Sequence, residues 1–143
     1  MSYNYARIRL ASTDYVPTVD WHMITDPDIS QLNLIYRTYC QYKKFKSVMP
    51  IFDSEYTDPN NDIIGYTDNG QLVAFSIISR YNTKNAKCAQ FAWTYHNPKL
   101  RLGIESLKTE CAIYRDRGFE FLYLDQAHLY KQQFQGFETL GPI

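Results

Sequence analysis

Apolar residues follow two different periods in the first third of the chain. In residues 5–11, Ile8 and Leu10 fall on one face between polar neighbours, which is typical of a half-buried strand. In residues 28–45, apolar residues recur at helical spacing after an Asp-Pro pair, and lysines gather at the C-terminal end, where the helix dipole favours cations. The pattern predicts a strand and then a helix whose apolar stripe is Leu32, Ile35, Tyr36, Tyr39 and Tyr42.

The middle of the chain predicts a loop and then a hairpin. Residues 47–62 are rich in proline, aspartate and asparagine, which favours a long loop with room for one helical turn. Two apolar segments within residues 62–82 flank Asp68-Asn69-Gly70, a strong tight-turn signal. Another strand is expected over residues 86–98, and Asn97-Pro98 ends it.

The last third of the chain predicts a helix and a buried strand. Residues 100–117 have a helical apolar stripe, and Gly118 fits a C-terminal cap. Residues 119–125 are almost continuously apolar, as expected of a buried and parallel strand. A short helix over residues 126–134 and an extended segment over residues 136–143 follow. The stripe of the long helix comprises Ile104, Leu107, Cys111 and Tyr114.

These elements predict an α/β protein with one mixed sheet. Their order is strand, helix, loop, three strands, helix, strand, helix, strand. A helix between two strands acts as a crossover, so the strands around Phe91 and Leu122 are expected to be parallel neighbours. The chain of 143 residues is long enough for one domain. We therefore predict a single domain over residues 1–143, with five or more strands in its sheet.

Composition narrows the classes of function. The 15 basic and 15 acidic residues balance, which argues against a general affinity for nucleic acid or acidic membranes. No apolar run has the length of a membrane span, and the N-terminus lacks the apolar core of a signal peptide. Three cysteines without a CxxC spacing predict free thiols in a reducing, cytoplasmic compartment. The histidines have no metal-ligand spacing with the cysteines.

The order of elements resembles the GNAT superfamily of N-acyltransferases. In that family a glycine-bearing turn with the pattern Q/R-x-x-G-x-G/A leads into a helix that holds the pyrophosphate of acyl-CoA. Residues 100–105 align with this pattern. Gly103 matches, Arg101 lies beside the first position, and Glu105 stands where a small neutral residue is expected. A carboxylate there would repel a pyrophosphate.

The resemblance implies a donor site and a co-substrate. The helix start would contribute Arg101, Leu102, Gly103 and Ile104. The preceding strand would contribute main-chain groups of residues 91–95, with Ala92, Trp93 and Thr94 at its centre. The co-substrate would be acetyl-CoA or another acyl-CoA, and the acceptor an amine on a small molecule or a protein.

The C-terminal residues resemble a second branch of the same fold. Tyr130, Lys131, Phe134, Gly136 and Phe137 are similar to the Y-K-x-x-F element of arginyl- and leucyl-tRNA–protein transferases and of the peptidoglycan-bridge enzymes. Their donor is an aminoacyl-tRNA, so tRNA would be the one nucleic acid partner. Two alternatives to an acyl-CoA enzyme therefore stay open: an aminoacyl-tRNA-dependent transferase, and a non-catalytic module that has lost the donor site.

Three residues are candidates for acid–base chemistry. The resemblance places Tyr130 where many GNAT enzymes have the tyrosine that protonates the leaving thiolate. Asp125 and His96 end predicted strands, where α/β sheets tend to bind ligands, and either could serve as base; capping or surface roles are the alternatives. GNAT domains usually add a sixth and a seventh strand beside the acceptor site, whereas this sequence stops at Ile143. The acceptor site would be open, completed by a second copy in a homodimer, or absent.

Overall fold

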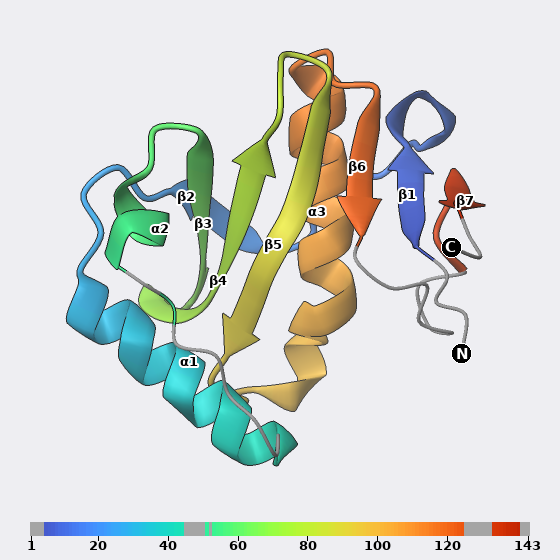
Figure 1. Ribbon diagram of the computed structural model, residues 1–143. Helices are drawn as coiled ribbons and strands as arrows, with labels where there is room; N and C mark the ends of the chain where they lie inside the picture. The colour runs from blue at the N-terminus through green and yellow to red at the C-terminus, as the bar shows by residue number, and fades with distance from the viewer. Residues whose placement is uncertain (1–4, 45–50, 52, 125–132, 141–143) are drawn as a thin grey trace.

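The computed structural model describes residues 5–44, 51, 53–124 and 133–140. These residues form a seven-stranded mixed sheet in the order β2-β3-β4-β5-β6-β1-β7 (Figure 1). The strands are β1 (Ala6–Arg9), β2 (Asp20–Met23), β3 (Asn61–Asp68), β4 (Gln71–Arg80), β5 (Asn85–Trp93), β6 (Phe121–Leu124) and β7 (Phe137–Thr139). The helices are α1 (Ile29–Lys43), α2 (Asp53–Thr57) and α3 (Leu102–Asp116), with 3₁₀ turns at Leu10–Ser12 and Pro98–Leu100.

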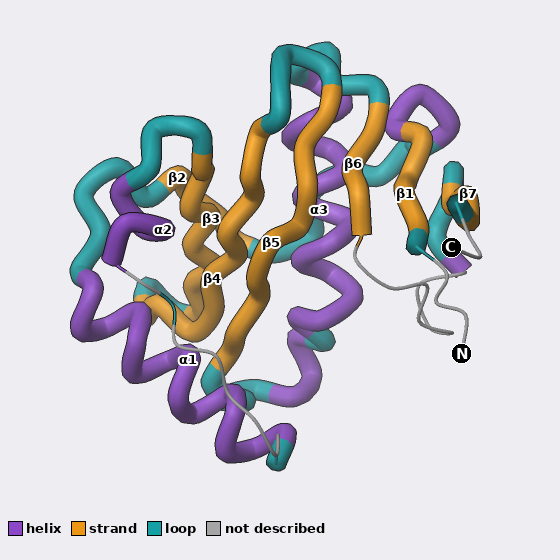
Figure 2. Tube along the Cα trace, viewed as in Figure 1, coloured by secondary structure: helices purple, strands orange, loops and turns teal. Residues whose placement is uncertain are grey.

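Helices cover both faces of the sheet (Figures 1 and 2). Successive residues of a strand point to opposite faces, and two buried clusters follow this alternation. On one face, Phe75 and Ile77 of β4 pack in a cluster with residues of α1 and α2, including Leu32 and Tyr56. On the other face, Ala74 and Ile78 pack in a cluster with α3 residues, namely Leu107, Cys111, Ile113 and Tyr114. The predicted α/β class and the mixed sheet are confirmed.

The helix predicted over residues 28–45 is α1, and its start has the expected cap. Asp28 is the N-cap, and its carboxylate accepts a hydrogen bond from the Gln31 N–H at 3.1 Å. The hairpin is also confirmed, since β3 and β4 are antiparallel and Asn69 and Gly70 both have positive φ values, 52° and 79°. The described residues of the loop predicted over 47–62 include the short helix α2, and β3 begins at Asn61.

Several details differ from the prediction, among them the end of the strand predicted over residues 86–98, which is Trp93. The strand β2 was not predicted, because its four residues form a partly exposed strand at the edge of the sheet. The helix predicted from residue 100 begins at Leu102, since Arg101 takes a left-handed conformation with φ 50° after a 3₁₀ turn. The apolar run at 119–125 becomes a strand at Phe121, because the N–H of Phe119 still bonds to the Tyr114 carbonyl at 2.9 Å and closes the helix.

The N-terminal strand lies inside the sheet, between β6 and β7 (Figure 1). It is antiparallel to both, and Ile8 pairs with Leu122 on one side and Phe137 on the other. Glu138 of β7 forms ion pairs with Arg7 at 3.0 Å and Arg9 at 3.1 Å. Both ends of the chain therefore contribute to the sheet beyond β6. In the described part of the chain, no helix has the length and apolar character of a membrane span.

Gly136 allows the segment before β7 to lie close to the backbone of Arg9 in β1. Gly136→Ala is therefore expected to destabilise the fold. Its φ is 70°, and a Cβ there would meet the Arg9 carbonyl oxygen at 2.4 Å. The variant therefore adds a backbone clash to a left-handed strain of about 1–2 kcal/mol. Gly118→Ala is the control, because φ is 85° and a Cβ would meet nothing within 4 Å. Guanidinium unfolding of both variants measures the difference; equal losses would mean that the β1 contact tolerates a side chain.

Candidate functional site

The strand β5 leaves its parallel neighbour after three residue pairs. Asn85, Ala86 and Lys87 pair with residues 121–123 of β6. Toward β4 the register shifts between two pairs, Ile77 with Gln90 and Ile78 with Cys88, so Ala89 is an extra residue. Such a bulge bends a strand and increases its twist. Beyond it, β5 and β6 diverge toward their C-terminal ends (Figure 1).

The divergence leaves backbone groups of β5 facing away from β4. The Thr94 N–H donates to the Val73 carbonyl at 2.9 Å. Hydrogen-bonded and non-bonded pairs alternate in an antiparallel ladder, so Phe91 and Trp93 direct their N–H and C=O groups to the opposite side. No described strand pairs with them there, and the Phe91 carbonyl accepts from the Gln90 side chain at 3.1 Å. An extended ligand with amide groups could bond to this edge.

The turn after β5 brings the start of α3 to the same end of the sheet (Figure 2). Asn97 caps the 3₁₀ turn by accepting from the Lys99 N–H at 3.2 Å. In α3, the N–H groups of Ile104 and Glu105 both bond to the Arg101 carbonyl, each at 3.0 Å. Those of Leu102 and Gly103 have no backbone acceptor among the described residues. A Cβ on Gly103 would meet nothing within 4 Å, so there is open space beside this residue, whereas Leu102 is buried.

The acidic residue of this turn already has partners. Glu105 accepts a hydrogen bond from the Thr18 hydroxyl at 2.5 Å and lies 3.8 Å from the Lys108 ammonium. Its side chain is 18% exposed. The hydroxyl and the ammonium reduce the repulsion that this carboxylate would exert on an anion at the helix start. Thr18 lies far from this turn in the sequence, so the pattern of residues 100–105 contained no signal for the contact.

A stack of aromatic rings connects the end of β5 to α1. The ring of Tyr95 lies 3.9 Å from that of Tyr42 and 4.1 Å from that of Trp93, measured between centroids. Burial raises the pKa of the Tyr95 hydroxyl, and φ is 57° at this residue. The helical spacing of Tyr39 and Tyr42 was the only sequence signal for this cluster. The stack holds the segment between Trp93 and the start of α3 against α1.

Comparisons with solved structures identify the fold. No protein-family model and no curated sequence matches the chain. A GCN5-related N-acetyltransferase from Anabaena variabilis superposes with a TM-score of 0.66 at 8% identity, over 98% of this chain and 38% of that one. The N-myristoyltransferase of Saccharomyces cerevisiae, with bound myristoyl-CoA, gives a TM-score of 0.65 at 12% identity, over 95% of this chain and 46% of that one. The chain has the GNAT fold.

A third protein with the GNAT fold is similar over a shorter part of the chain. It is the C-terminal domain of a protein described as a lysylphosphatidylglycerol synthetase from Agrobacterium fabrum, with a TM-score of 0.68 at 13% identity. The match covers 87% of this chain and 46% of that one. The chain therefore spans less than half of each of these three proteins. The predicted resemblance to the GNAT superfamily is confirmed at the level of fold.

The GNAT fold brings together only some of the residues predicted for the site. Trp93 and Leu102 bury their side chains in one cluster between β5 and α3. By the ladder alternation, Trp93 also turns its backbone to the free side of β5, whereas Ala92 and Thr94 face β4. Arg101 and Gly103 are exposed at the helix start.

Of the three candidates for acid–base chemistry, the structure describes only His96. Asp125 and Tyr130 lie outside the described residues. The Nε2 of His96 lies 3.7 Å from Oδ2 of Asp68, at the hairpin turn of β3 and β4. In the sheet order, that turn is on the opposite side of β5 from β6. The imidazole is 48% exposed.

Proposed function

We propose that the chain is an N-acyltransferase that transfers an acyl group from acyl-CoA to the amine of a small molecule or a protein. The observation that carries the proposal is the divergence of β5 from β6 after Lys87. It leaves a strand edge with which no described strand pairs, and this edge runs toward Gly103 at the start of α3. In acyl-CoA, the thioester is joined to an extended chain that contains amides, and a diphosphate group follows at the far end of that chain. The edge of β5 offers partners for the amides, and the start of α3 for the diphosphate.

The reaction needs three events at one carbonyl. The amine nitrogen attacks the thioester carbon, the carbon–sulfur bond breaks, and a proton passes from nitrogen to the departing sulfur. Tyr130 is the proposed acid for the sulfur, and Asp125 the proposed base for the amine. His96 is the alternative base, although its partner Asp68 lies on the other side of β5 from β6. In this scheme the backbone of β5 holds the carbonyl, so its residues position the donor without exchanging a proton.

An aminoacyl-tRNA is the second candidate donor. It is supported by the likeness to a domain described as part of a lysylphosphatidylglycerol synthetase and by Glu105, which replaces the small residue of the acyl-CoA pattern. Calorimetry with acetyl-CoA and filter binding with charged tRNA separate the two donors. A chain that binds neither would be a non-catalytic module with the GNAT fold.

The substitutions Gly103→Ala and Gly103→Trp test the donor site. Both add a side chain where a Cβ would meet nothing within 4 Å, so both should fold, and alanine should add up to about 1 kcal/mol of stability because it favours a helix. Only the indole is large enough to cover the neighbouring N–H groups. We expect calorimetry to show unchanged acetyl-CoA affinity for Gly103→Ala and at least roughly tenfold weaker binding for Gly103→Trp. Equal affinities would place the donor elsewhere.

A further inference from the structure

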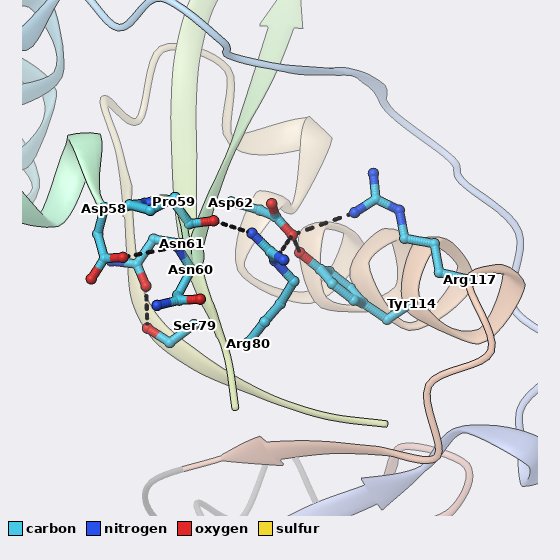
Figure 3. Close-up of polar contacts among 9 residues, drawn as sticks. All are labelled: Asp58, Pro59, Asn60, Asn61, Asp62, Ser79, Arg80, Tyr114 and Arg117. Atoms are coloured by element: carbon cyan, nitrogen blue, oxygen red, sulfur yellow. Dashed lines mark hydrogen bonds and ion pairs between the residues drawn. The ribbon is translucent and has the colours of Figure 1, made fainter. Parts of the chain in front are cut away.

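Two arginines share one carboxyl group (Figure 3). The cluster lies at the other end of α3 from Gly103. Arg80 ends β4 and Arg117 follows α3. Oδ2 of Asp62 lies 3.2 Å from Nε of Arg80, accepts from Nη1 of Arg117 at 3.4 Å and accepts from the hydroxyl of Tyr114 at 2.5 Å. With two guanidinium groups and one carboxylate, the cluster has an excess of positive charge. The 15-residue α3 separates it from the proposed donor site by about 22 Å.

The arginines retain donors that the described residues do not use. Nε of Arg80 is buried and, despite its distance from Asp62, is not aligned for a hydrogen bond with any described residue. Nη2 of Arg80 donates to the Pro59 carbonyl. A guanidinium group has five N–H donors in a planar fork. The guanidinium groups of Arg80 and Arg117 therefore have N–H donors beyond those used in the described contacts, and their side chains are 33% and 43% exposed.

Two cavities meet at these arginines, and their linings differ in charge. One, of about 550 Å³, is also lined by the carboxylates of Asp26, Asp58 and Asp62. The other, of about 560 Å³, has no acidic residue among the described residues that line it. An anion would be repelled in the first cavity and attracted in the second. Both volumes fall within the range of small-molecule sites.

The second cavity combines polar donors with apolar surface. Asn60 and Asn82 contribute side-chain amides, and Oδ1 of Asn82 is already occupied by the N–H groups of Lys84 and Asn85, each at 2.8 Å. The Asn82 amide therefore presents its NH₂ donor. The rings of Tyr81 and Phe119 complete the lining, and Tyr81 is 60% exposed. Guanidinium and amide donors suit an oxyanion, whereas the two rings suit an apolar or aromatic group.

The carbonyl groups at the end of α3 repel an anion less strongly than the unpaired carbonyls of an uncapped helix C-terminus would. The N–H groups of Gly118 and Phe119 bond to the carbonyls of Arg115 and Tyr114, at 3.0 and 2.9 Å. Burial, and then the hydrogen bond to Asp62, raises the pKa of the Tyr114 hydroxyl far above its usual value. The hydroxyl therefore keeps its proton and donates to Asp62, which leaves more of the guanidinium groups to a ligand.

We propose that Arg80 and Arg117 form a binding site for a small molecule with a phosphate or carboxylate group and an apolar or aromatic part. Asp62 already occupies the position between the two guanidinium groups, so the oxyanion lies against them from the second cavity, and the apolar part lies against Tyr81 and Phe119. The site is separate from the proposed donor site and does not depend on acyl transfer. It would allow a metabolite to bind at the end of the molecule where β5 and β6 are still paired.

Phenyl phosphate and benzoate are the probes for this site, with inorganic phosphate and phenol as partial ligands. Amide chemical shifts of the whole chain, followed by NMR during titration, report where each probe binds. We expect saturable shifts around residues 80–83 and 117–119. Phenyl phosphate or benzoate should bind more tightly than phosphate or phenol, and the tighter of the two anions identifies the preferred group. Arg117→Gln should weaken its binding at least tenfold, and Tyr81→Ala should weaken phenyl phosphate more than inorganic phosphate.

Arg101→Gln at the start of α3 is the matched control, because it removes a cation of the same kind from the other end of the helix. It should leave this binding unchanged. Arg117 and Tyr81 are both exposed, so their variants should fold, and thermal unfolding verifies this. Shifts confined to the start of α3, equal affinity of Arg117→Gln and the unmodified chain, or no saturation by about 10 mM would each overturn the proposal.

Discussion

Replacing Glu110 by alanine is expected to lower the free energy of unfolding by about 3–5 kcal/mol, because two buried hydroxyls lose their acceptor and the side chain leaves a cavity. Glu110 lies on α3, is 3% exposed, and faces the centre of the sheet. Its Oε2 accepts from the hydroxyls of Tyr66 at 2.5 Å and Ser76 at 2.8 Å, and its Oε1 from the thiol of Cys88 at 3.7 Å. These donors come from β3, β4 and β5, so one carboxyl group connects three strands to the helix.

The loss should be large because the donors are buried with their acceptor. Burial first, and then the Glu110 carboxyl group, raises the pKa of Tyr66 well above its usual value, so the phenol remains a donor. Alanine leaves two buried hydroxyls without this acceptor, and each such group costs about 1–3 kcal/mol. The side chain also leaves a cavity that the surrounding residues fill only in part.

Three further variants distinguish the effect of lost hydrogen bonds on stability from the effect of lost side-chain volume. Glu110→Gln keeps one acceptor oxygen and should lose less than Glu110→Ala. A triple variant with Glu110→Leu, Tyr66→Phe and Ser76→Ala removes the polar groups together and should recover much of the stability. Glu105→Ala, on the same helix, should cost less than about 1 kcal/mol because its carboxylate pairs near the surface. Urea unfolding measures all four, and a loss for Glu110→Ala no larger than for Glu105→Ala would contradict the argument.

Local patterns predicted the elements of this fold because the signals lie within a few residues of each other. The cap at Asp28, the turn at Asn69-Gly70 and the stripe Leu107–Cys111–Tyr114 each depend on near neighbours. The place of β1 depends on pairing with β6 and β7 at the other end of the sequence. Its residues ARIR would suit any sheet with one buried face, so the sequence contained no local signal for that position.

In the candidate site, too, the sequence predicted the local features and missed the contacts between residues that are distant in the sequence. Gly103 lies at the start of a helix, as the alignment with the GNAT pattern implied, because a glycine after a strand and a turn is a local feature. The contact of Thr18 with Glu105 and the approach of Arg80 to Arg117 exist only in the folded chain. Glu110 did have a signal, since a charged residue three positions from Leu107 and one from Cys111 interrupts the apolar stripe. A buried polar side chain is normally hydrogen-bonded, so a charged residue within the apolar stripe predicts a buried polar network.

Replacing Tyr130 by phenylalanine is expected to lower turnover roughly 100-fold, the lower end of what a positioned acid contributes. The change removes one oxygen and keeps the ring, so thermal stability should change little. Affinity for the donor should also change little, because the sulfur needs a proton only as the carbon–sulfur bond breaks. Loss of turnover without loss of binding is thus the expected signature of the acid, as opposed to a residue that holds the donor.

The assay measures release of free thiol from acetyl-CoA in the presence of an amine acceptor, and calorimetry measures donor affinity for the same variant. Tyr5→Phe is the control, because it removes a hydroxyl from another tyrosine, 40% exposed, next to β1. It should behave like the unmodified chain in both measurements. Equal turnover in Tyr130→Phe would make Tyr130 a packing residue and would leave Asp125 and His96 as the groups to test. A proton donor should also give turnover an alkaline limb, and Tyr130→Phe should remove that limb.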